Sequence, residues 1–160
     1  MRYLTTSELI YINGIVLNNP KILSGRQQIR DFALLDAAVA RPAASAFGED
    51  AYPTLNEKVA VMVHSVTRNH PFTDGNKRTA VVAAVFMLGV NGQRVVWERD
   101  DALKMILDVA QGRADAEALA RWFPLVPGES APAPDADQDM RAIARIVEEQ
   151  KGLLDELARR

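Results

Sequence analysis

The side chains best suited to chemistry lie close together in the middle of the chain. A base, a carboxylate and two cations stand in one short run, His70-Pro71-Phe72-Thr73-Asp74-Gly75-Asn76-Lys77-Arg78. An apolar stretch, residues 80–88, follows almost at once and predicts a buried helix that begins near Asn76. The first N–H groups of such a helix have no partner within it, and the positive end of the helix dipole adds to their attraction for anions. The run is therefore predicted to bind phosphate.

Three residues of this loop sharpen that prediction. Gly75 lets the backbone turn without steric cost, and Lys77 adds positive charge where phosphate oxygens would lie. Asp74 would repel phosphate unless a divalent cation joined the two groups. Mg²⁺ is commonly bound by one or two carboxylates together with phosphate oxygens. The loop therefore predicts a magnesium ion beside the phosphates.

The same residues resemble the signature of the Fic/Doc family, His-Pro-Phe-x-Asp/Glu-Gly-Asn-Gly/Lys-Arg, at every defined position from 70 to 78. The resemblance implies an all-α Fic fold, a helical bundle with a flap loop, and ATP as the nucleotide. It makes His70 the catalytic base for a target hydroxyl, Phe72 the anchor of the loop in the core, and Asp74 the Mg²⁺ ligand. The residues implied to hold the phosphates of the nucleotide are Gly75, Asn76, Lys77 and Arg78.

Two positions depart from the commoner family pattern. Lys77 stands where adenylyl-transferring members usually have glycine, and Val81 stands where they usually have a second arginine. Both resemble the Doc branch, the death-on-curing toxins of toxin–antitoxin pairs, which has Asn-Lys-Arg-Thr-Ala at residues 76–80. The resemblance implies a toxin that transfers phosphate from ATP to a hydroxyl of a protein and inhibits growth. It also implies a translation factor, elongation factor Tu, as the target.

Two other functions remain open at this point. In an adenylyltransferase the same loop would hold ATP in the opposite orientation, and the α-phosphate would be attacked. In a non-catalytic module the loop would only grip a nucleotide or a partner. A lone histidine more often packs or caps than catalyses, and a lone Asp-Gly-Asn is usually a turn. The combination of His70, Asp74 and Arg78 in one loop favours an enzyme.

Composition narrows the setting of this chemistry. The chain has 160 residues, enough for one domain with an appendage. It contains no cysteine, which is typical of a reducing cytoplasm. The longest apolar run, residues 80–88, is too short to span a bilayer, so no membrane association is expected. The net charge is −2, which disfavours direct nucleic-acid binding.

Helical spacing of apolar residues and capping signals recur along the chain. Thr5-x-x-Glu8 and Thr54-x-x-Glu57 have the form of capping boxes at helix starts. A loop with Ser24 and Gly25 follows the first helix. The predicted elements are helices over 6–17, 31–40, 55–69, from Asn76, from a cap at Asp100 or Asp101 to Ala110, and 115–123, with a short extended segment at 95–97.

The connection over residues 41–53 is long for a compact domain, and such connections are often functional. The resemblance implies a flap that binds the target through Ser45, Phe47 and Gly48; the alternative is a disordered surface loop. Ser45-x-x-x-Glu49-Asp50 is superficially similar to the inhibitory motif of self-inhibited Fic enzymes, but its last residue is wrong. The resemblance therefore implies restraint by a cognate antitoxin in trans.

The C-terminal part has a different composition. We predict a Fic/Doc domain over 1–126, a linker rich in Pro, Ala, Gly and Asp over 127–138, and an amphipathic helix over 139–160. Apolar residues on this helix recur at three- and four-residue spacing, so that face has to be covered. Either the protein's own core or another chain, such as a second copy in a homo-oligomer, could cover it.

Overall fold

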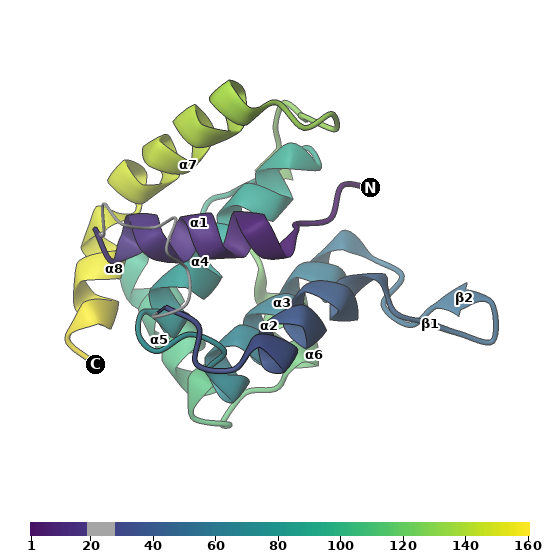
Figure 1. The fold of residues 1–160 in the computed structure, drawn as a ribbon, viewed down its shortest axis with the longest axis horizontal. Coiled ribbons are helices and arrows are strands. Elements are labelled where there is room, and N and C mark those ends of the chain that lie inside the picture. The colour runs from purple at the N-terminus through teal and green to yellow at the C-terminus, as the bar shows by residue number, and fades with distance from the viewer. Residues whose placement is uncertain (19–27) are drawn as a thin grey trace.

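The computed structural model describes residues 1–18 and 28–160, and the predicted loop with Ser24 and Gly25 lies outside these ranges. The described residues are mainly helical, which confirms the all-α prediction (Figure 1). Their helices are α1 (Thr6–Val16), α2 (Phe32–Ala40), the short 3-10 helix η2 (Arg41–Ala43), α3 (Leu55–Asn69), α4 (Asn76–Val90), α5 (Arg99–Ala110), α6 (Ala116–Trp122), α7 (Ala136–Glu149) and α8 (Lys151–Ala158). The strands form two small antiparallel pairs, β1 (Ser45–Ala46) with β2 (Glu49–Asp50) and β3 (Gln93–Val95) with β4 (Leu125–Pro127).

Helix α4 is the centre of the fold. It contacts α1, α3, α5, α7 and α8, so it is surrounded by protein on most sides. Its residues from Ala80 to Leu88 are buried except Val85, which explains why the sequence there is apolar without a helical stripe. Because α4 is held by so many neighbours, its N-terminus is a rigid platform for the loop before it.

The predicted caps fix the starts of the two helices next to α4. At α1, the Thr5 hydroxyl accepts from the Glu8 N–H, and the Glu8 carboxylate accepts from the Thr5 N–H, which completes a capping box. At α3, the Thr54 hydroxyl accepts from the Glu57 N–H but donates to the Glu57 carboxylate. The bounds of both helices agree closely with those predicted from the sequence.

Two local predictions differ from the structure. Helix α5 begins at Arg99 with Glu98 as its N-cap, so neither Asp100 nor Asp101 caps it; both lie in the first turn, where the helix dipole favours negative charge. The extended segment is Gln93–Val95, because its partner strand is Leu125–Pro127. Strand β4 reaches Pro127, the first residue of the predicted linker. Its partner strand lies about 30 residues earlier in the chain, so local composition could not predict the pairing.

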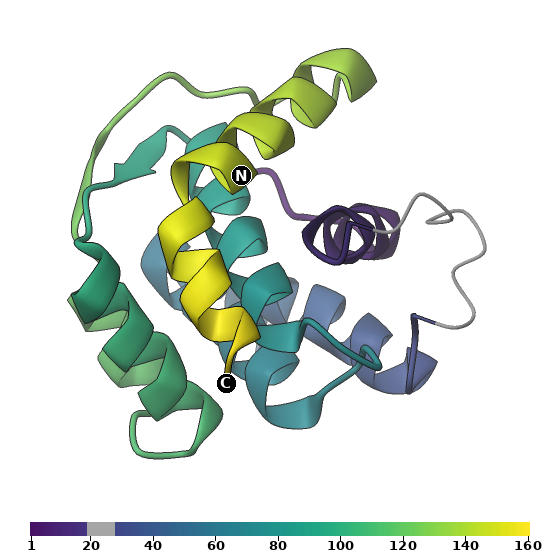
Figure 2. The ribbon, with the colours of Figure 1, turned by 90° about the vertical axis from the view of Figure 1, so that its left-hand side faces the viewer.

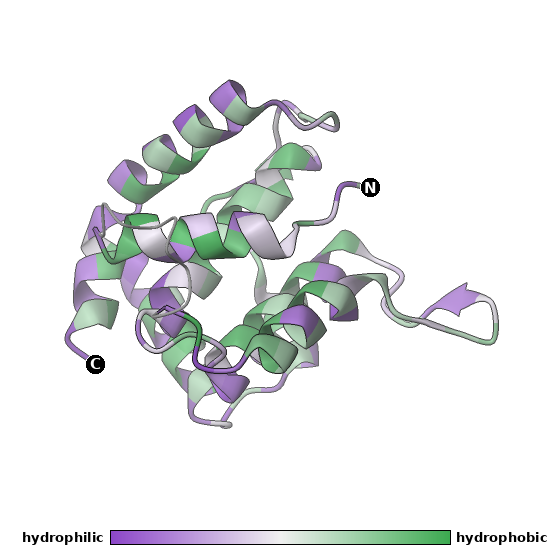
Figure 3. Ribbon diagram, in the orientation of Figure 1, coloured by the Kyte–Doolittle hydropathy of each residue, from purple (hydrophilic) through white to green (hydrophobic). Residues whose placement is uncertain are grey.

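Within the connection over residues 41–53, β1 and β2 form an ordered hairpin that projects from the bundle (Figure 1). Its two turn residues, Phe47 and Gly48, both have positive φ, the geometry of a tight two-residue turn. Figure 3 colours β2 as hydrophilic, and the Phe47 side chain is fully exposed. The buried Lys58 ammonium holds the base of the hairpin by donating to Asp50 Oδ2 at 3.1 Å and to the Pro42 carbonyl at 3.2 Å.

The C-terminal tail forms two helices, α7 and α8, where the sequence predicted one. Their apolar faces pack on the protein's own core, and Figure 2 shows α8 lying over α4 and beside α5. The buried side chains of the tail are Ile143, Leu153, Leu154 and Leu157. Independent folding of residues 1–126 stays a prediction. Within the described ranges, no helix has the length and apolar character needed to cross a membrane.

Candidate functional site

His70 terminates α3 in the left-handed conformation, with φ 50° and ψ 60°. Histidine tolerates this region better than most residues, although it still costs energy. The guanidinium of Arg30 stabilises the turn, because Nε donates to the His70 carbonyl and Nη2 to the Asn69 carbonyl, both at 2.6 Å. These bonds satisfy carbonyls at the end of α3 and leave the His70 imidazole at the surface.

The segment that precedes α2 runs beside the loop and fixes its backbone. The Thr73 N–H donates to the Gln28 carbonyl at 2.7 Å, and the Arg30 N–H donates to the Pro71 carbonyl at 2.8 Å. Between these bonds, Ile29 forms a β-bridge with Phe72, whose side chain is completely buried. The loop therefore has two fixed supports, a backbone pairing on one side and an aromatic ring in the core.

Two asparagine side chains hold the second half of the loop. Asn76 accepts from the Phe72 N–H at 3.0 Å and donates to the Phe72 carbonyl at 2.9 Å. Asn13, buried in α1, donates to the Asp74 carbonyl at 2.9 Å and to the Thr79 hydroxyl at 3.0 Å. The side-chain amide of Asn76 is thus engaged within the loop, and its backbone N–H is the group that it can offer to a phosphate.

The N-terminus of α4 faces the same loop. Gly75 precedes the helix with φ +75°, a conformation that favours glycine, and its carbonyl accepts the first intrahelical bond from the Thr79 N–H at 2.8 Å. The N–H groups of residues 76–78 come before that bond, so they point out of the helix end. Such an end, with the dipole behind it, can hold a phosphate.

Asp74 and Arg78 form the polar edge of the loop. The guanidinium Nη2 of Arg78 lies 3.7 Å from Asp74 Oδ1, and Nη1 donates to the Val16 carbonyl at 3.2 Å. Asp74 Oδ1 also accepts from the Gly75 N–H at 2.7 Å. The Asp74 side chain is 74% exposed, so solvent screens its ion pair with Arg78 and the carboxylate lies open to a ligand.

His70 has the protonation behaviour of a base. Although His70 is exposed, partial loss of its solvent shell lowers the pKa of its imidazole below the ordinary value, and the nearby charges of Lys77, Arg30 and Arg68 lower it further. The imidazole is therefore neutral at neutral pH and can accept a proton. The cations that lower this pKa come from three elements: α3, the segment before α2, and the first turn of α4.

The sequence of this chain matches known proteins over the part that carries the loop. The sequence profile of the Fic/DOC family matches residues 3–88. The chain is 44% identical over 98 residues to the protein named Toxin Doc of Mycolicibacterium smegmatis (strain ATCC 700084 / mc(2)155), and the match covers 60% of this chain and 75% of that protein. The chain belongs to the Fic/DOC family. The resemblance predicted from residues 70–78 is confirmed, and the tail helices lie outside the residues that the family profile matches.

The two positions that depart from the commoner Fic/DOC pattern have different environments. Val81 is completely buried on α4, so this position faces the core and offers no cation to a phosphate. Lys77 lies in the first turn of α4 at an intermediate exposure, and its charge acts on His70. The cationic side chains that this helix end can offer a phosphate are therefore Lys77 and Arg78.

The donor set of the Fic/DOC loop suits a magnesium ion that arrives with a nucleotide. Among the described residues, no group of three or more His, Cys, Asp or Glu side chains could form a metal site by protein ligands alone. Asp74 supplies one exposed carboxylate beside the helix end, and Mg²⁺ is typically held by one or two carboxylates together with phosphates and water. The loop therefore fits Mg²⁺ bound jointly by Asp74 and phosphate oxygens.

The residues that the sequence predicted to form the flap do not lie beside His70. The hairpin with Ser45, Phe47 and Gly48 precedes α3, whereas His70 follows it. The 15 residues of α3 separate the two by a helix of about 22 Å. The segment placed against the loop is instead residues 28–31. Binding of a target by the hairpin stays a prediction.

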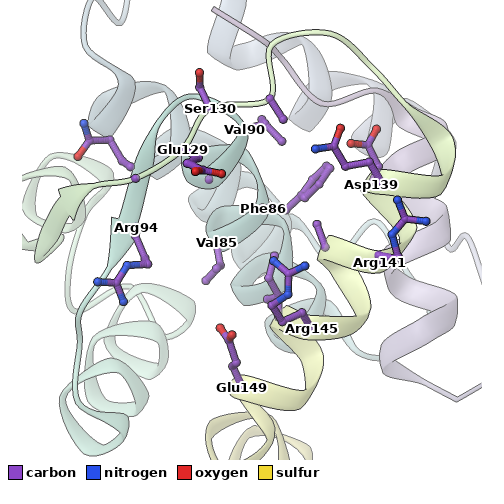
Figure 4. Close-up of a pocket in the computed structure, with 17 residues that line it drawn as sticks. Val85, Phe86, Val90, Arg94, Glu129, Ser130, Asp139, Arg141, Arg145 and Glu149 are labelled. Carbon is purple, nitrogen blue, oxygen red and sulfur yellow. The ribbon is translucent and has the colours of Figure 1, made fainter.

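A cavity of about 350 Å³ lies between α4, β3 and α7 (Figure 4). Phe86 forms part of its wall, and Arg145 and Glu149 line it from α7. Its lining includes no residue of the 70–78 loop, so it is separate from the candidate active site.

Sequence reasoning missed the residues that support the loop. Asn13 and Gln28 are buried polar residues, joined by a hydrogen bond of 3.1 Å from Gln28 Nε2 to Asn13 Oδ1. A signal existed for Asn13, which stands in the apolar series of the first predicted helix and is costly to bury without partners. The sequence around Arg30 carries no such signal, because the carbonyls that it binds lie about 40 residues away.

Proposed function

We propose that this protein is a Doc-type toxin, a transferase that moves the terminal phosphate of ATP to a hydroxyl of a protein. The observation that carries the proposal is the junction of α3 and α4: His70, neutral and exposed, ends one helix where the N-terminus of the next begins. A base beside an anion site is the arrangement that transfer to a hydroxyl requires. The toxin would act in the cytoplasm on a translation factor, and the family resemblance favours elongation factor Tu.

In the proposed reaction, each of these groups has one role. The His70 imidazole takes the proton of the target hydroxyl, and the hydroxyl oxygen forms a bond to the γ-phosphorus of ATP. The bond from that phosphorus to the bridging oxygen breaks, and ADP leaves with the electron pair. The N–H groups of residues 76–78 and the Arg78 guanidinium stabilise the negative charge. Mg²⁺ bound by Asp74 and the phosphates would neutralise part of that charge.

The first turn of α4 supports transfer of the terminal phosphate. Lys77 puts a bulky cation at the helix end, where adenylyl-transferring relatives have glycine and the phosphate chain can pass close to the backbone. Position 81, where those relatives have a second arginine, is the buried Val81. A short anion site with one arginine suits a terminal phosphate better than the middle of a longer chain.

The proposed partners of the toxin are a protein target and an antitoxin. The exposed Phe47 at the tip of the hairpin is a candidate contact for the target, together with Ser45 and Gly48, which share that hairpin. A cognate antitoxin in trans would restrain the enzyme. A homo-oligomer through the C-terminal helices stays a prediction, and it would have to use residues other than those buried against the core, since these are already covered.

The group transferred can be identified with labelled ATP. We expect a bacterial lysate treated with the protein to incorporate label from the γ-phosphate and none from the α-phosphate, and a His70→Asn variant to incorporate neither. Label from the α-phosphate would identify an adenylyltransferase. With purified elongation factor Tu and other candidate targets present, incorporation of neither label by the wild type would favour a binding module.

The metal can be tested separately on binding. Asp74→Asn should weaken ATP binding about tenfold in Mg²⁺ and change it little without metal, because the carboxylate is tolerable beside phosphate only through the cation. Calorimetric titration in both conditions measures this. Equal losses with and without Mg²⁺ would make Asp74 a structural turn residue.

A further inference from the structure

A second cavity, of about 280 Å³, opens beside the candidate active site. It lies between the C-terminal end of α1, the first turn of α4 and the two tail helices. Apolar side chains from α1, α7 and α8 form much of its wall: Ile15, Val16, Val147, Leu154 and Ala158. The polar residues around it are Asn18, Arg78, Glu148, Lys151 and Asp155.

Arg78 joins this cavity to the phosphate loop. Its guanidinium reaches Asp74 at 3.7 Å on one side and the Val16 carbonyl at 3.2 Å on the other. Val16 itself lines the cavity. A ligand whose phosphates lie at the N-terminus of α4 can therefore extend past Arg78 into the cavity. Arg78 is the last residue of the 70–78 loop and His70 is the first.

The residues that line the cavity indicate whether it suits the phosphates of a nucleotide or its base and ribose. Glu148 and Asp155 offset the charges of Arg78 and Lys151, and Lys151 Nζ lies 3.8 Å from Asp155 Oδ2, so the cavity offers a phosphate chain little net positive charge. A base can pack its faces against aliphatic side chains, and a carboxylate can accept a hydrogen bond from a ribose hydroxyl, as acidic residues do in dinucleotide-binding folds. The volume is smaller than that of a typical site for a whole drug-sized ligand, which suits a nucleoside without its phosphates.

We propose that this cavity binds the base and ribose of ATP, so that the C-terminal tail forms one wall of the nucleotide site. The inference rests on the proposed function, because it takes ATP as the ligand of the loop. It also fixes the orientation of ATP: the nucleoside lies beyond Arg78, and the terminal phosphate lies toward His70. In the opposite orientation, required for adenylyl transfer, the terminal phosphates would lie in a cavity where Glu148 and Asp155 offset the charges of Arg78 and Lys151.

Filling the cavity from its exposed rim tests this assignment without disturbing the core. Ala158 lines the cavity at the end of α8 and is exposed, so Ala158→Trp should fold. Ala144→Trp is the matched control, because Ala144 is exposed on α7 and does not line the cavity. Calorimetry would compare binding of ATP and of inorganic tripolyphosphate, each with Mg²⁺.

We expect Ala158→Trp to weaken ATP binding about tenfold or more and to leave tripolyphosphate binding within about twofold of the wild type. The control should change neither. Unchanged ATP affinity in Ala158→Trp, equal losses for both ligands, or wild-type binding of ATP no tighter than of tripolyphosphate would each overturn the proposal.

Photolabelling locates the base directly and requires no phosphate transfer. Irradiation with 8-azido-ATP should label the tryptic fragments 146–151 and 152–159, which contain the tail residues of the cavity. Competition by ATP should prevent it, and Ala158→Trp should reduce it. Label confined to the fragment with the β1–β2 hairpin would overturn the proposal. A labelled tail without γ-phosphate transfer would instead overturn the proposed function alone.

Discussion

The phosphate loop and the contact between the N-terminus and the tail both use ion pairs, but in opposite ways. In the loop, Arg78 lies 3.7 Å from Asp74, whose side chain is 74% exposed. In the tail contact, Arg2 is 5% exposed and lies 2.9 Å from Glu8 and 2.7 Å from Asp139. The first pair is loose and open to a ligand, whereas the second is closed and buried.

The pKa shifts show the same contrast. Hydrogen bonding from Arg2 lowers the pKa of the Asp139 carboxyl, so the charged pair stabilises the folded state. At the loop, burial and then the charges of Lys77, Arg30 and Arg68 lower the pKa of His70, which disfavours its protonated form. The ion pair of the tail contact therefore stabilises the fold. In the loop, the neutral base His70 lies among cations that can bind an anionic ligand.

The largest expected effect comes from removing the base. His70→Asn should reduce phosphate transfer by about 10²–10⁴-fold, because it removes the imidazole that takes the hydroxyl proton. Asparagine tolerates the left-handed conformation, so the variant should keep the loop and the free energy of unfolding. Single-turnover transfer and urea unfolding measure the two effects. Transfer at the wild-type rate by His70→Asn would show that His70 is not the catalytic base.

The next largest effect is expected in the free energy of unfolding of an Arg2→Met variant. Arg2→Met leaves Asp139 and Glu8 without their shared cation in a largely buried contact, and breaking such a pair costs about 3–5 kcal/mol. Urea unfolding at neutral pH measures this loss, while transfer by the folded fraction should be unchanged. The matched control is Arg121→Met, which breaks an exposed pair with Glu117 and should cost less than about 1 kcal/mol.

Lowering the pH provides an independent check of the same contact. The pKa of Asp139 is depressed on folding, so its contribution to stability is present above its unfolded pKa and is lost as the pH falls through the folded value. The stability difference between wild type and Arg2→Met should therefore narrow in acid. An Arg2→Met variant as stable as the Arg121→Met control would show that the tail contact is held by apolar packing alone.

These two regions also differ in how far the sequence predicts them. The loop is predictable because its residues are contiguous, and the caps at Thr5 and Thr54 are recognisable because each acts within one helical turn. The Arg2 pair with Asp139 spans 137 residues. No local pattern marks it, so the sequence left open whether the tail packs on its own core or on another chain.

Contacts between distant segments also explain why the sequence predicted only part of the candidate site. Residues 70–78 form one loop as predicted, but the backbone that pairs with it comes from residues 28–31. The hairpin over 45–50 has the length and composition of a functional connection, and sequence alone cannot show that α3 separates it from His70. Roles that depend on which segments meet in space require the fold.

The hairpin permits a test that separates target binding from chemistry. Phe47→Asn removes an exposed aromatic side chain and places at φ 55° a residue that tolerates this conformation. If the hairpin contacts the target, kcat/KM for the target should fall about tenfold, with ATP binding and stability unchanged. Phe47→Tyr keeps the ring and should retain most activity. Equal transfer by wild type and Phe47→Asn would exclude the hairpin tip from recognition.

The smallest expected effect tests whether the positive charge of Lys77 lowers the pKa of His70. Lys77→Met should raise the pKa of His70, because it removes one of the cations that oppose protonation, while the partial burial of the ring remains. The neutral imidazole is the active form, so the acid limb of the kcat/KM profile should move to higher pH. Lys77→Arg keeps the charge and should leave the limb in place.

Proton NMR can follow this shift without any substrate, since the chain has two histidines. His64 is an internal reference, because its pKa is lowered by burial and by Arg41 and Arg68 rather than by Lys77. In Lys77→Met the titration of the His70 ring should move upward while that of His64 stays in place. If both rings shift together, the substitution has changed the fold around α3; if neither shifts, Lys77 is screened from His70, and its role is confined to the nucleotide.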